Sequence, residues 1–255
     1  MDDLVADTTG RWQPNPQLRA LLHTDFSGNP ADPDDVIADA LDDGGYLERT
    51  PGLTAILQDH TADPAARLLA CRALTSWADP LGYATVLQAA AAPDHVVWRG
   101  QSADRFFGQD DTFGQLGDAV GASRDMVDER GTAEPRLAAA RALLSLADRV
   151  QFDRHITSLL SADIVEAARD EISATLERGI TRLTTGERIP YDLGLQLALL
   201  TRAMRTYDEP GANDATARLT AARPGGRALR ELMDRSPVRG GPASPPRTAS
   251  PSRFR

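Results

Sequence analysis

The sequence predicts an all-α protein, for three reasons. Apolar residues recur at spacings of three and four over eight segments, alternation with a period of two is nowhere sustained, and one helical segment occurs twice. With 255 residues, of which 41% are apolar, the chain is long enough to bury a sizeable core. Aromatic residues make up only 5%, so we expect leucine and alanine to fill most of the interior.

The expected helical domain spans 31–235 and lies between a loosely ordered N-terminal arm at 1–30 and a disordered tail at 236–255. The arm is interrupted by prolines and contains one short helix around Leu18–His23. The tail has five prolines, four arginines and almost no apolar side chain, so it cannot offset the entropy lost on ordering. Between them, helical spacing covers the segments 34–41, 53–59, 64–78, 81–91, 134–149, 151–160, 164–178 and 191–207, with a weaker segment at 227–234.

Capping residues and prolines mark the boundaries of several of these helices. Asp63-Pro64 places a capping carboxylate ahead of a proline suited to the first helical turn. Glu134-Pro135 is a weaker version of the same signal, and Pro80 and Pro190 lie in gaps between segments. These signals predict where the helices begin.

An octapeptide occurs twice at an offset of 69 residues. Arg-Ala-Leu-Thr-Ser-Trp-Ala-Asp stands at 72–79 and Arg-Ala-Leu-Leu-Ser-Leu-Ala-Asp at 141–148, with six of eight positions identical. On a helix Arg72, Ser76 and Asp79 form one stripe, which we expect to face solvent, and the second copy repeats this stripe. The broad apolar remainder is typical of a helix packed between neighbours, as in repeat proteins.

The chain resembles bacterial HEAT-like (PBS-lyase-type) repeat proteins over residues 50–92 and 132–162. The resemblance rests on Asp63-Pro64 followed by Arg67, Ala70, Ala73-Leu74 and Asp79-Pro80, and then an apolar helix. It implies a curved α-solenoid of antiparallel helix pairs, with an irregular, degenerate repeat at 93–131. It implies no single activity, because a fold does not determine a function.

The irregular segment 93–131 gathers aromatic and arginine side chains in a glycine-rich connection. These are Trp98, Arg99, Arg105, Phe106, Phe107 and Phe113. Because such residues dominate interface hot spots, we expect Trp98, Arg99, Arg105 and Phe107 to bind a partner. The alternative is that the phenylalanines fill the gap left by a degenerate repeat.

The charge is acidic overall and unevenly distributed. The formal net charge is −9, and residues 1–60 alone hold 12 acids against three arginines. An acidic body repels phosphate backbones, so a nucleic-acid partner is unlikely on electrostatic grounds and a basic protein partner is favoured. No segment is apolar enough to span a membrane and no secretory signal follows Met1, which predicts a cytoplasmic protein.

The acidic run at 32–43 includes three candidate partner-binding residues, Asp34, Asp35 and Asp39. It is not a calcium loop, because Ile37 stands where the turn glycine is needed. A solvated helix face is the plainer interpretation of the run.

The sequence offers no local support for catalysis, a metal or a cofactor. The four histidines are scattered singly, and no His-Glu dipeptide or Gly-x-Ser-x-Gly motif occurs. Cys71 falls on an apolar helix face, which favours a buried structural thiol.

Two functions remain open. The first is a non-enzymatic protein–protein interaction module, such as an adaptor, a regulator or a toxin-neutralising immunity-type protein. The second is a HEAT-like enzyme that acts on a nucleic-acid base or a bilin-type ligand in a concave face, where Asp104 and Trp98 are candidates. Further concave-face candidates are Arg67, Arg72, Trp77, Arg136 and Arg141.

Overall fold

The computed structural model describes residues 12–41, 44–103, 108–234 and 236, and over these residues the protein is all-helical. β-Structure in the described ranges is confined to two isolated bridges, Thr24 with Pro30 and Ala103 with Asp110. The expected all-α class is therefore confirmed for these residues. No described helix is long and apolar enough to cross a membrane.

The N-terminal helices are α1 (Pro16–Leu22), α2 (Pro33–Asp39) and α3 (Tyr46–Gln58). The described part of the expected loose arm is packed, because α1 buries Leu18 and Leu22 completely and contacts α3. Helix α3 begins before the expected segment 53–59. The reason is that it accommodates Pro51 in its interior, where the pattern favoured a break.

The proline-led helices α4 (Pro64–Ser76) and α5 (Pro80–Ala91) begin where the Asp-Pro pairs predict. The Asp63 carboxylate accepts a hydrogen bond from the backbone N–H of Ala65 at 2.8 Å, and that of Asp79 accepts one from Leu81 at 2.9 Å. Ala78, between the two helices, adopts the left-handed conformation that reverses the chain.

The middle of the chain contains helices that the periodicity did not reveal. After the short 3-10 turn η2 (Pro93–His95), the chain forms α6 (Thr112–Ala122), η3 (Ser123–Met126) and α7 (Val127–Arg130). Glycines lower the helix propensity of α6, but they serve packing. A Cβ atom at Gly121 would lie 2.5 Å from the carbonyl oxygen of Ser158.

Helix α8 (Ala133–Leu144) ends five residues before the expected end at 149. Its following turn is held by Gln196, which donates to the carbonyls of Ala147 at 2.7 Å and Val150 at 3.1 Å and accepts from Phe152 N–H. The buried Gln196 side chain thus provides hydrogen bonds for backbone N–H and C=O groups that would be paired within the helix if α8 were longer.

The C-terminal part begins with two short helices, which longer helices follow. They are η4 (Asp153–Leu159), α9 (Ala162–Ala167), α10 (Arg169–Thr184), α11 (Leu193–Met204), α12 (Glu209–Ala221) and α13 (Gly226–Met233). The expected helix at 151–160 is a 3-10 helix, and the one expected at 164–178 is divided at Ala168. Helix α12 was not expected, although Asp208 and Pro210 give it the same start signal as α4.

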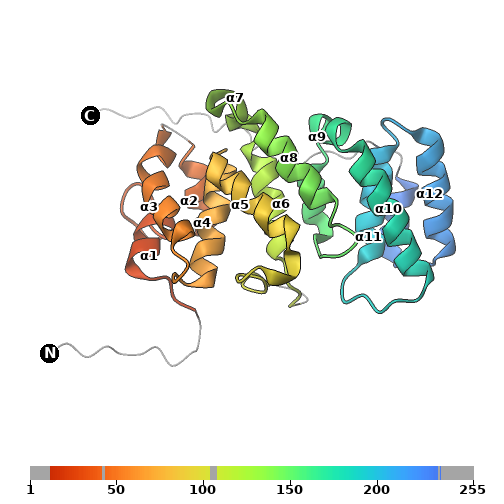
Figure 1. Ribbon diagram of the computed structural model, residues 1–255, viewed down its shortest axis with the longest axis horizontal. Coiled ribbons are helices and arrows are strands. Elements are labelled where there is room, and N and C mark those ends of the chain that lie inside the picture. The colour runs from red at the N-terminus through yellow and green to blue at the C-terminus, as the bar shows by residue number, and fades with distance from the viewer. Residues whose placement is uncertain (1–11, 42–43, 104–107, 235, 237–255) are drawn as a thin grey trace, which may run out of the picture.

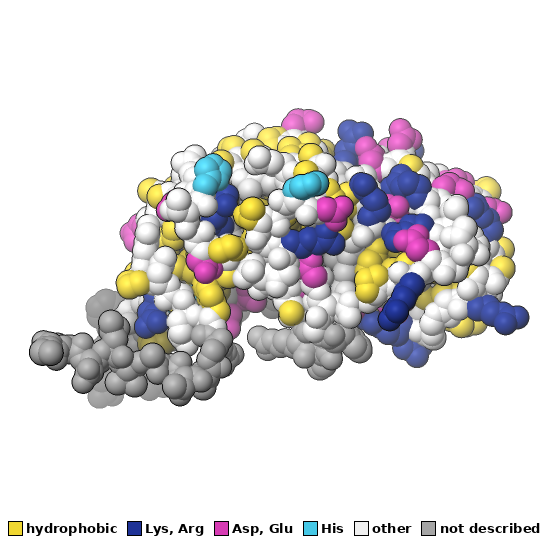
Figure 2. Space-filling view, turned by 60° about the horizontal axis from the view of Figure 1, so that its bottom comes forward, with side chains coloured by type: hydrophobic (Ala, Val, Ile, Leu, Met, Phe, Trp, Pro, Cys, Tyr) yellow, Lys and Arg dark blue, Asp and Glu magenta, His cyan; other side chains and the backbone are white. Residues whose placement is uncertain are grey.

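Along the long axis of the molecule the helices run from α1 at one end to α12 at the other, although α7 lies back above α5 (Figure 1). Helix α4 packs against α6 and α5 packs against α8, so that one helix pair lies on the next. η4 lies between α6 and α11, and every residue of α11 is buried. The buried residues form one core cluster that extends from α1 to α13. On the face seen in Figure 2, arginine and acidic side chains lie next to one another over this core.

We expect Gly121→Ala to lower the free energy of unfolding by roughly 1–3 kcal/mol, because the added methyl group must displace the backbone of η4 from α6. The matched control is Gly226→Ala, since a Cβ atom there meets nothing within 4 Å. Chemical denaturation followed by circular dichroism measures both. Equal stability of the two variants would show that the α6–η4 contact is not close-packed.

Candidate functional site

The acidic residue that ends the first octapeptide links neighbouring helices and does not face solvent. Asp79 accepts a hydrogen bond from Arg130 Nη2 of α7 at 2.8 Å, and both side chains are largely buried. The Arg130 guanidinium also lies 5.5 Å from the centre of the Tyr46 ring. Ser76 is buried as well. The expectation of a solvent-facing stripe was therefore wrong for this copy, because Arg72 and Asp79 are paired with Asp34 of α2 and Arg130 of α7.

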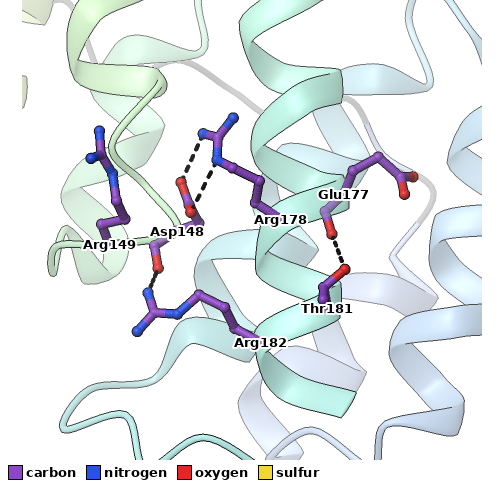
Figure 3. Close-up of a pocket in the computed structure, with 6 residues that line it drawn as sticks. All are labelled: Asp148, Arg149, Glu177, Arg178, Thr181 and Arg182. Atoms are coloured by element: carbon purple, nitrogen blue, oxygen red, sulfur yellow. Dashed lines mark hydrogen bonds and ion pairs between the residues drawn. The ribbon is translucent and has the colours of Figure 1, made fainter. Parts of the chain in front are cut away.

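The second octapeptide ends in a similar link. Asp148 is 2% exposed, and its carboxylate accepts from Arg178 Nε at 3.2 Å and Nη2 at 2.8 Å (Figure 3). The two copies differ in their first residue, since Arg72 binds Asp34 of the preceding α2 whereas Arg141 binds Glu171 of the following α10. The two octapeptides are thus alike in that an arginine of a later helix binds the last carboxylate of each. They differ in the helix that the first arginine contacts.

A small groove lies where α4 meets the connection that leads to α6. Its volume is about 170 Å³, and its lining residues are Trp12, Ala65, Leu68, Leu69, Arg72, Gln101 and Ser102. The Trp12 side chain donates from Nε1 to Asp63 at 3.0 Å, and the residue remains 39% exposed. Sequence reasoning missed Trp12, although an aromatic residue in a polar arm was a usable signal.

The groove joins two sets of predicted residues. Arg72, a concave-face candidate, lines it and binds Asp34, a partner-binding candidate, at 2.7 Å. The Asp34 side chain stays 69% exposed, the neighbouring Asp35 is also exposed, and Asp39 is half-buried. We call the surface formed by Trp12, Asp34, Asp35, Leu69 and Arg72 the α2–α4 surface.

The aromatic and arginine connection has a different role from the one expected. Trp98 is only 6% exposed, so it packs in the core and is not a surface anchor. Arg99 is engaged by two carboxylates, Asp94 at 2.5 Å and Asp110 at 3.1 Å. These contacts fold the connection back on itself and bring Gln101 and Ser102 to the groove. The remaining candidates Asp104, Arg105, Phe106 and Phe107 lie outside the described residues.

Several concave-face candidates are interior contacts. Trp77 is completely buried and donates from Nε1 to the carbonyl of Ile37 at 2.9 Å. Arg136 is also buried, and it binds the carbonyl of Val120 and the carboxylate of Asp163. Arg67 is half-buried against the carbonyl of Leu57. Trp77 and Arg136 therefore cannot line an open cleft, because neighbouring helices cover them.

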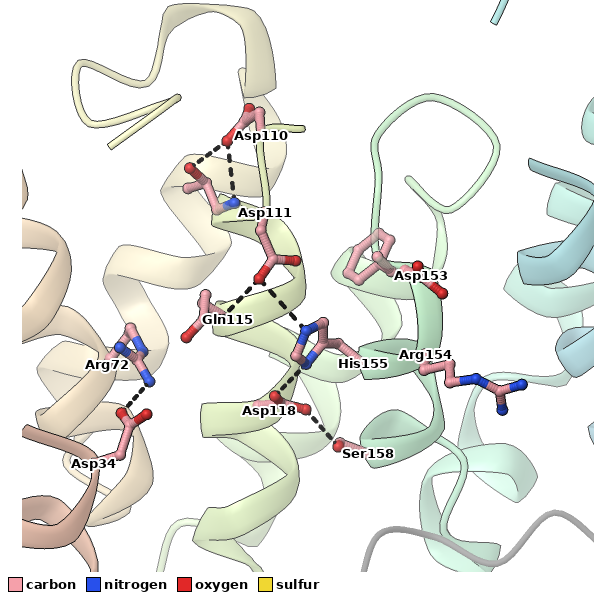
Figure 4. A network of polar contacts seen from close by, with 12 residues as sticks. Asp34, Arg72, Asp110, Asp111, Gln115, Asp118, Asp153, Arg154, His155 and Ser158 are labelled. Carbon is pink, nitrogen blue, oxygen red and sulfur yellow. Dashed lines mark hydrogen bonds and ion pairs between the residues drawn. The ribbon is translucent and has the colours of Figure 1, made fainter. Parts of the chain in front are cut away.

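A partly exposed polar network joins α6 to η4 around His155 (Figure 4). The imidazole Nδ1 donates to Asp118, and Nε2 lies 3.4 Å from Asp111. The hydrogen bond to Asp118, aided by the charges of Asp111 and Asp153, raises the pKa of His155 to about 9 despite burial. Ser158 donates to the same Asp118 carboxylate at 2.6 Å. Since Ser158 contacts the aspartate and not the imidazole, this arrangement binds the two helices together and does not activate a nucleophile.

The Cys71 thiol has the character expected of a structural residue. It is completely buried, and this burial raises the pKa of the thiol to about 12. Within the described ranges, no three His, Cys, Asp or Glu side chains are grouped so that they could hold a metal ion.

No family model, curated protein or solved structure matches this chain.

We predict that His155→Gln lowers the free energy of unfolding by about 1 kcal/mol at pH 6, because it removes charge-assisted contacts that solvent partly screens. A pKa raised from 6.5 to about 9 means that the folded state gains stability below pH 6.5 and loses this gain as the pH rises through 9. The stability difference between wild type and variant should therefore shrink as the pH rises from about 6.5 to about 9.

Denaturant titrations of both proteins at several pH values measure this difference. The comparison isolates His155 from the other titrating groups, because these are common to both proteins. A difference that stays constant from pH 6 to pH 10 would contradict a charged imidazole at this joint.

Proposed function

We propose that this protein is a cytoplasmic, non-enzymatic interaction module that binds a basic protein partner through the α2–α4 surface. The observation that carries the proposal is the placement of exposed aspartates beside an apolar groove with an exposed tryptophan. Adaptor, regulatory and toxin-neutralising roles all fit this surface, and they differ only in the identity of the partner.

The charge around α2 is the first support. The described residues up to 60 contain seven acids and two arginines, which is a formal net charge of −5. Arg49 does little to neutralise this surface, because it is buried under α1 and donates to the carbonyls of Leu21 and Thr24. A surface of net negative charge steers a basic partner toward it and disfavours a nucleic acid.

The groove adds an apolar contact area to the charged surface. Specific interfaces combine an apolar centre with a polar rim, and tryptophan and arginine dominate their binding energy. Here Trp12 and Leu69 form an apolar centre, and Arg72 with Asp34 forms a charged edge. The small volume of the groove suits a single inserted side chain better than a whole ligand.

The scaffold is consistent with a HEAT-like α-solenoid, which we include in the proposal. Its support is the packing of the α4–α5 pair on the α6–α8 pair and the recurrence of the carboxylate–arginine link after α4 and α8. Stacked helix pairs present extended surfaces to partners.

We expect Asp35→Arg to weaken partner binding about tenfold, because a favourable rim charge becomes a repulsive one. Trp12→Ala should cost about 2 kcal/mol, a loss of roughly thirtyfold, because it removes the apolar anchor. Affinity capture from cells that make the protein, with quantitative mass spectrometry, identifies the partner, and titration calorimetry then gives the affinities.

Glu209→Arg is the matched control, since Glu209 is an exposed acid in the first turn of α12, as Asp35 is in the first turn of α2. The control should capture the partner as wild type does. If the captured partner binds both α2–α4 variants as tightly as wild type, the α2–α4 surface is not the binding site.

A further inference from the structure

A second surface, on the side of α10, carries the opposite charge. A shallow pocket of about 620 Å³ lies between α10 and the turn that follows α8 (Figure 3). Its lining residues are Asp148, Arg149, Glu177, Arg178, Thr181 and Arg182. Three guanidinium groups therefore surround a pocket that has two carboxylates in its lining.

The two carboxylates are already bound by arginines. Asp148 is buried behind Arg178, which holds it through Nε and Nη2. The carboxylate of Glu177 points away from Arg178 in Figure 3, and Arg218 binds its two oxygens at 2.6 and 2.9 Å. Neither acid is therefore left to neutralise an additional cation at the mouth of the pocket.

One arginine of the pocket has no such partner. Arg149 is exposed and forms no ion pair with any described residue, whereas Arg182 is bound by Glu187. The Arg178 Nη1 group likewise makes no hydrogen bond to a described residue, since Asp148, Ser145 and Thr175 take only Nε and Nη2. The lining of the pocket thus includes guanidinium donors that no described residue satisfies.

We propose that the α10 pocket binds an acidic segment of a protein partner, with a carboxylate placed between Arg149 and Arg178. Guanidinium donors match the planar geometry of a carboxylate, which they bind in pairs. The proposal goes beyond the α2–α4 surface and does not depend on it, because it concerns another face and a partner of opposite charge.

Three features favour an acidic peptide over other anions. The pocket is too shallow to enclose most of the surface of a small ligand. A nucleic acid needs a continuous basic stripe, whereas the three arginines of this pocket form only a local cluster. The aliphatic stems of the arginines and the Thr181 methyl group offer apolar contacts to peptide side chains between the carboxylates.

The test uses fluorescence anisotropy of a short labelled peptide in which glutamate alternates with leucine. We expect wild type to bind the peptide with an affinity that falls as salt is added. Arg149→Glu should weaken binding about tenfold, since attraction becomes repulsion.

Arg124→Glu is the matched control and should bind as wild type does, because Arg124 is also exposed and forms no ion pair among the described residues. Asp35→Arg should likewise not weaken peptide binding, which separates this pocket from the α2–α4 surface.

Several results would overturn the proposal. The first is that wild type fails to bind the peptide at roughly millimolar concentration. The second is that Arg124→Glu and Arg149→Glu lose affinity for the peptide equally. The third is that a polyphosphate probe of equal charge binds more tightly than the peptide. The last result would identify a general polyanion surface.

Discussion

The structure depends on carboxylates that are buried where one helix ends and the next layer begins. Asp79 and Asp148 stand at the ends of the two octapeptides, and each is bound by an arginine from a later helix. A carboxylate removed from water costs several kcal/mol unless it is paired with good geometry. The chain therefore cannot place α7 or α10 elsewhere without leaving one of these charges uncompensated. Leucine and alanine supply most of the burial, and these pairs specify which helix packs on which.

This use of charge inside the fold determines which groups remain for partners. Most described arginines contact carboxylates or carbonyls of neighbouring helices, as Arg130, Arg136 and Arg178 do. A group that the scaffold does not need is therefore informative in this protein. Arg149 after α8 is such a group and lines the α10 pocket. Asp35 on α2 is another, and its chain neighbour Asp34 binds Arg72 of the groove. Charge complementarity at such positions affects the rate and the specificity of association with a partner more than it affects the binding affinity.

The sequence predicted the helices that have strong local signals and missed those that depend on distant contacts. Asp-Pro caps located α4, and the repeated octapeptide located α4 and α8. Helix α6 was missed because its glycines reduce helix propensity. Gly121 is needed because the backbone of η4, about forty residues away in the sequence, leaves no room for a Cβ atom. The end of α8 depends on Gln196, which no local pattern connects with residue 147.

The candidate site was predictable in part, and the errors have one physical origin. A stripe at positions i, i+4 and i+7 shows that polar residues share one side of a helix. It does not show whether water or another helix faces that side. For Arg72 and Asp79 the answer is α2 and α7, which provide the compensating charges. The pairing of Asp34 with Arg72 could be foreseen as charge complementarity, but not as a contact across 38 residues.

The distribution of aromatic side chains gives the strongest reason to place a partner at the α2–α4 surface. Trp77, Tyr83, Phe113 and Phe152 are almost completely buried, because a core built from alanine and leucine needs large side chains to fill the space between helices. Trp98 joins them, which leaves Trp12 as the exposed tryptophan. Its indole N–H is held by Asp63, so the ring is fixed in place before any partner arrives. A tryptophan that is already ordered loses little entropy on binding, and a partner that covers the ring would bury the apolar area it still exposes.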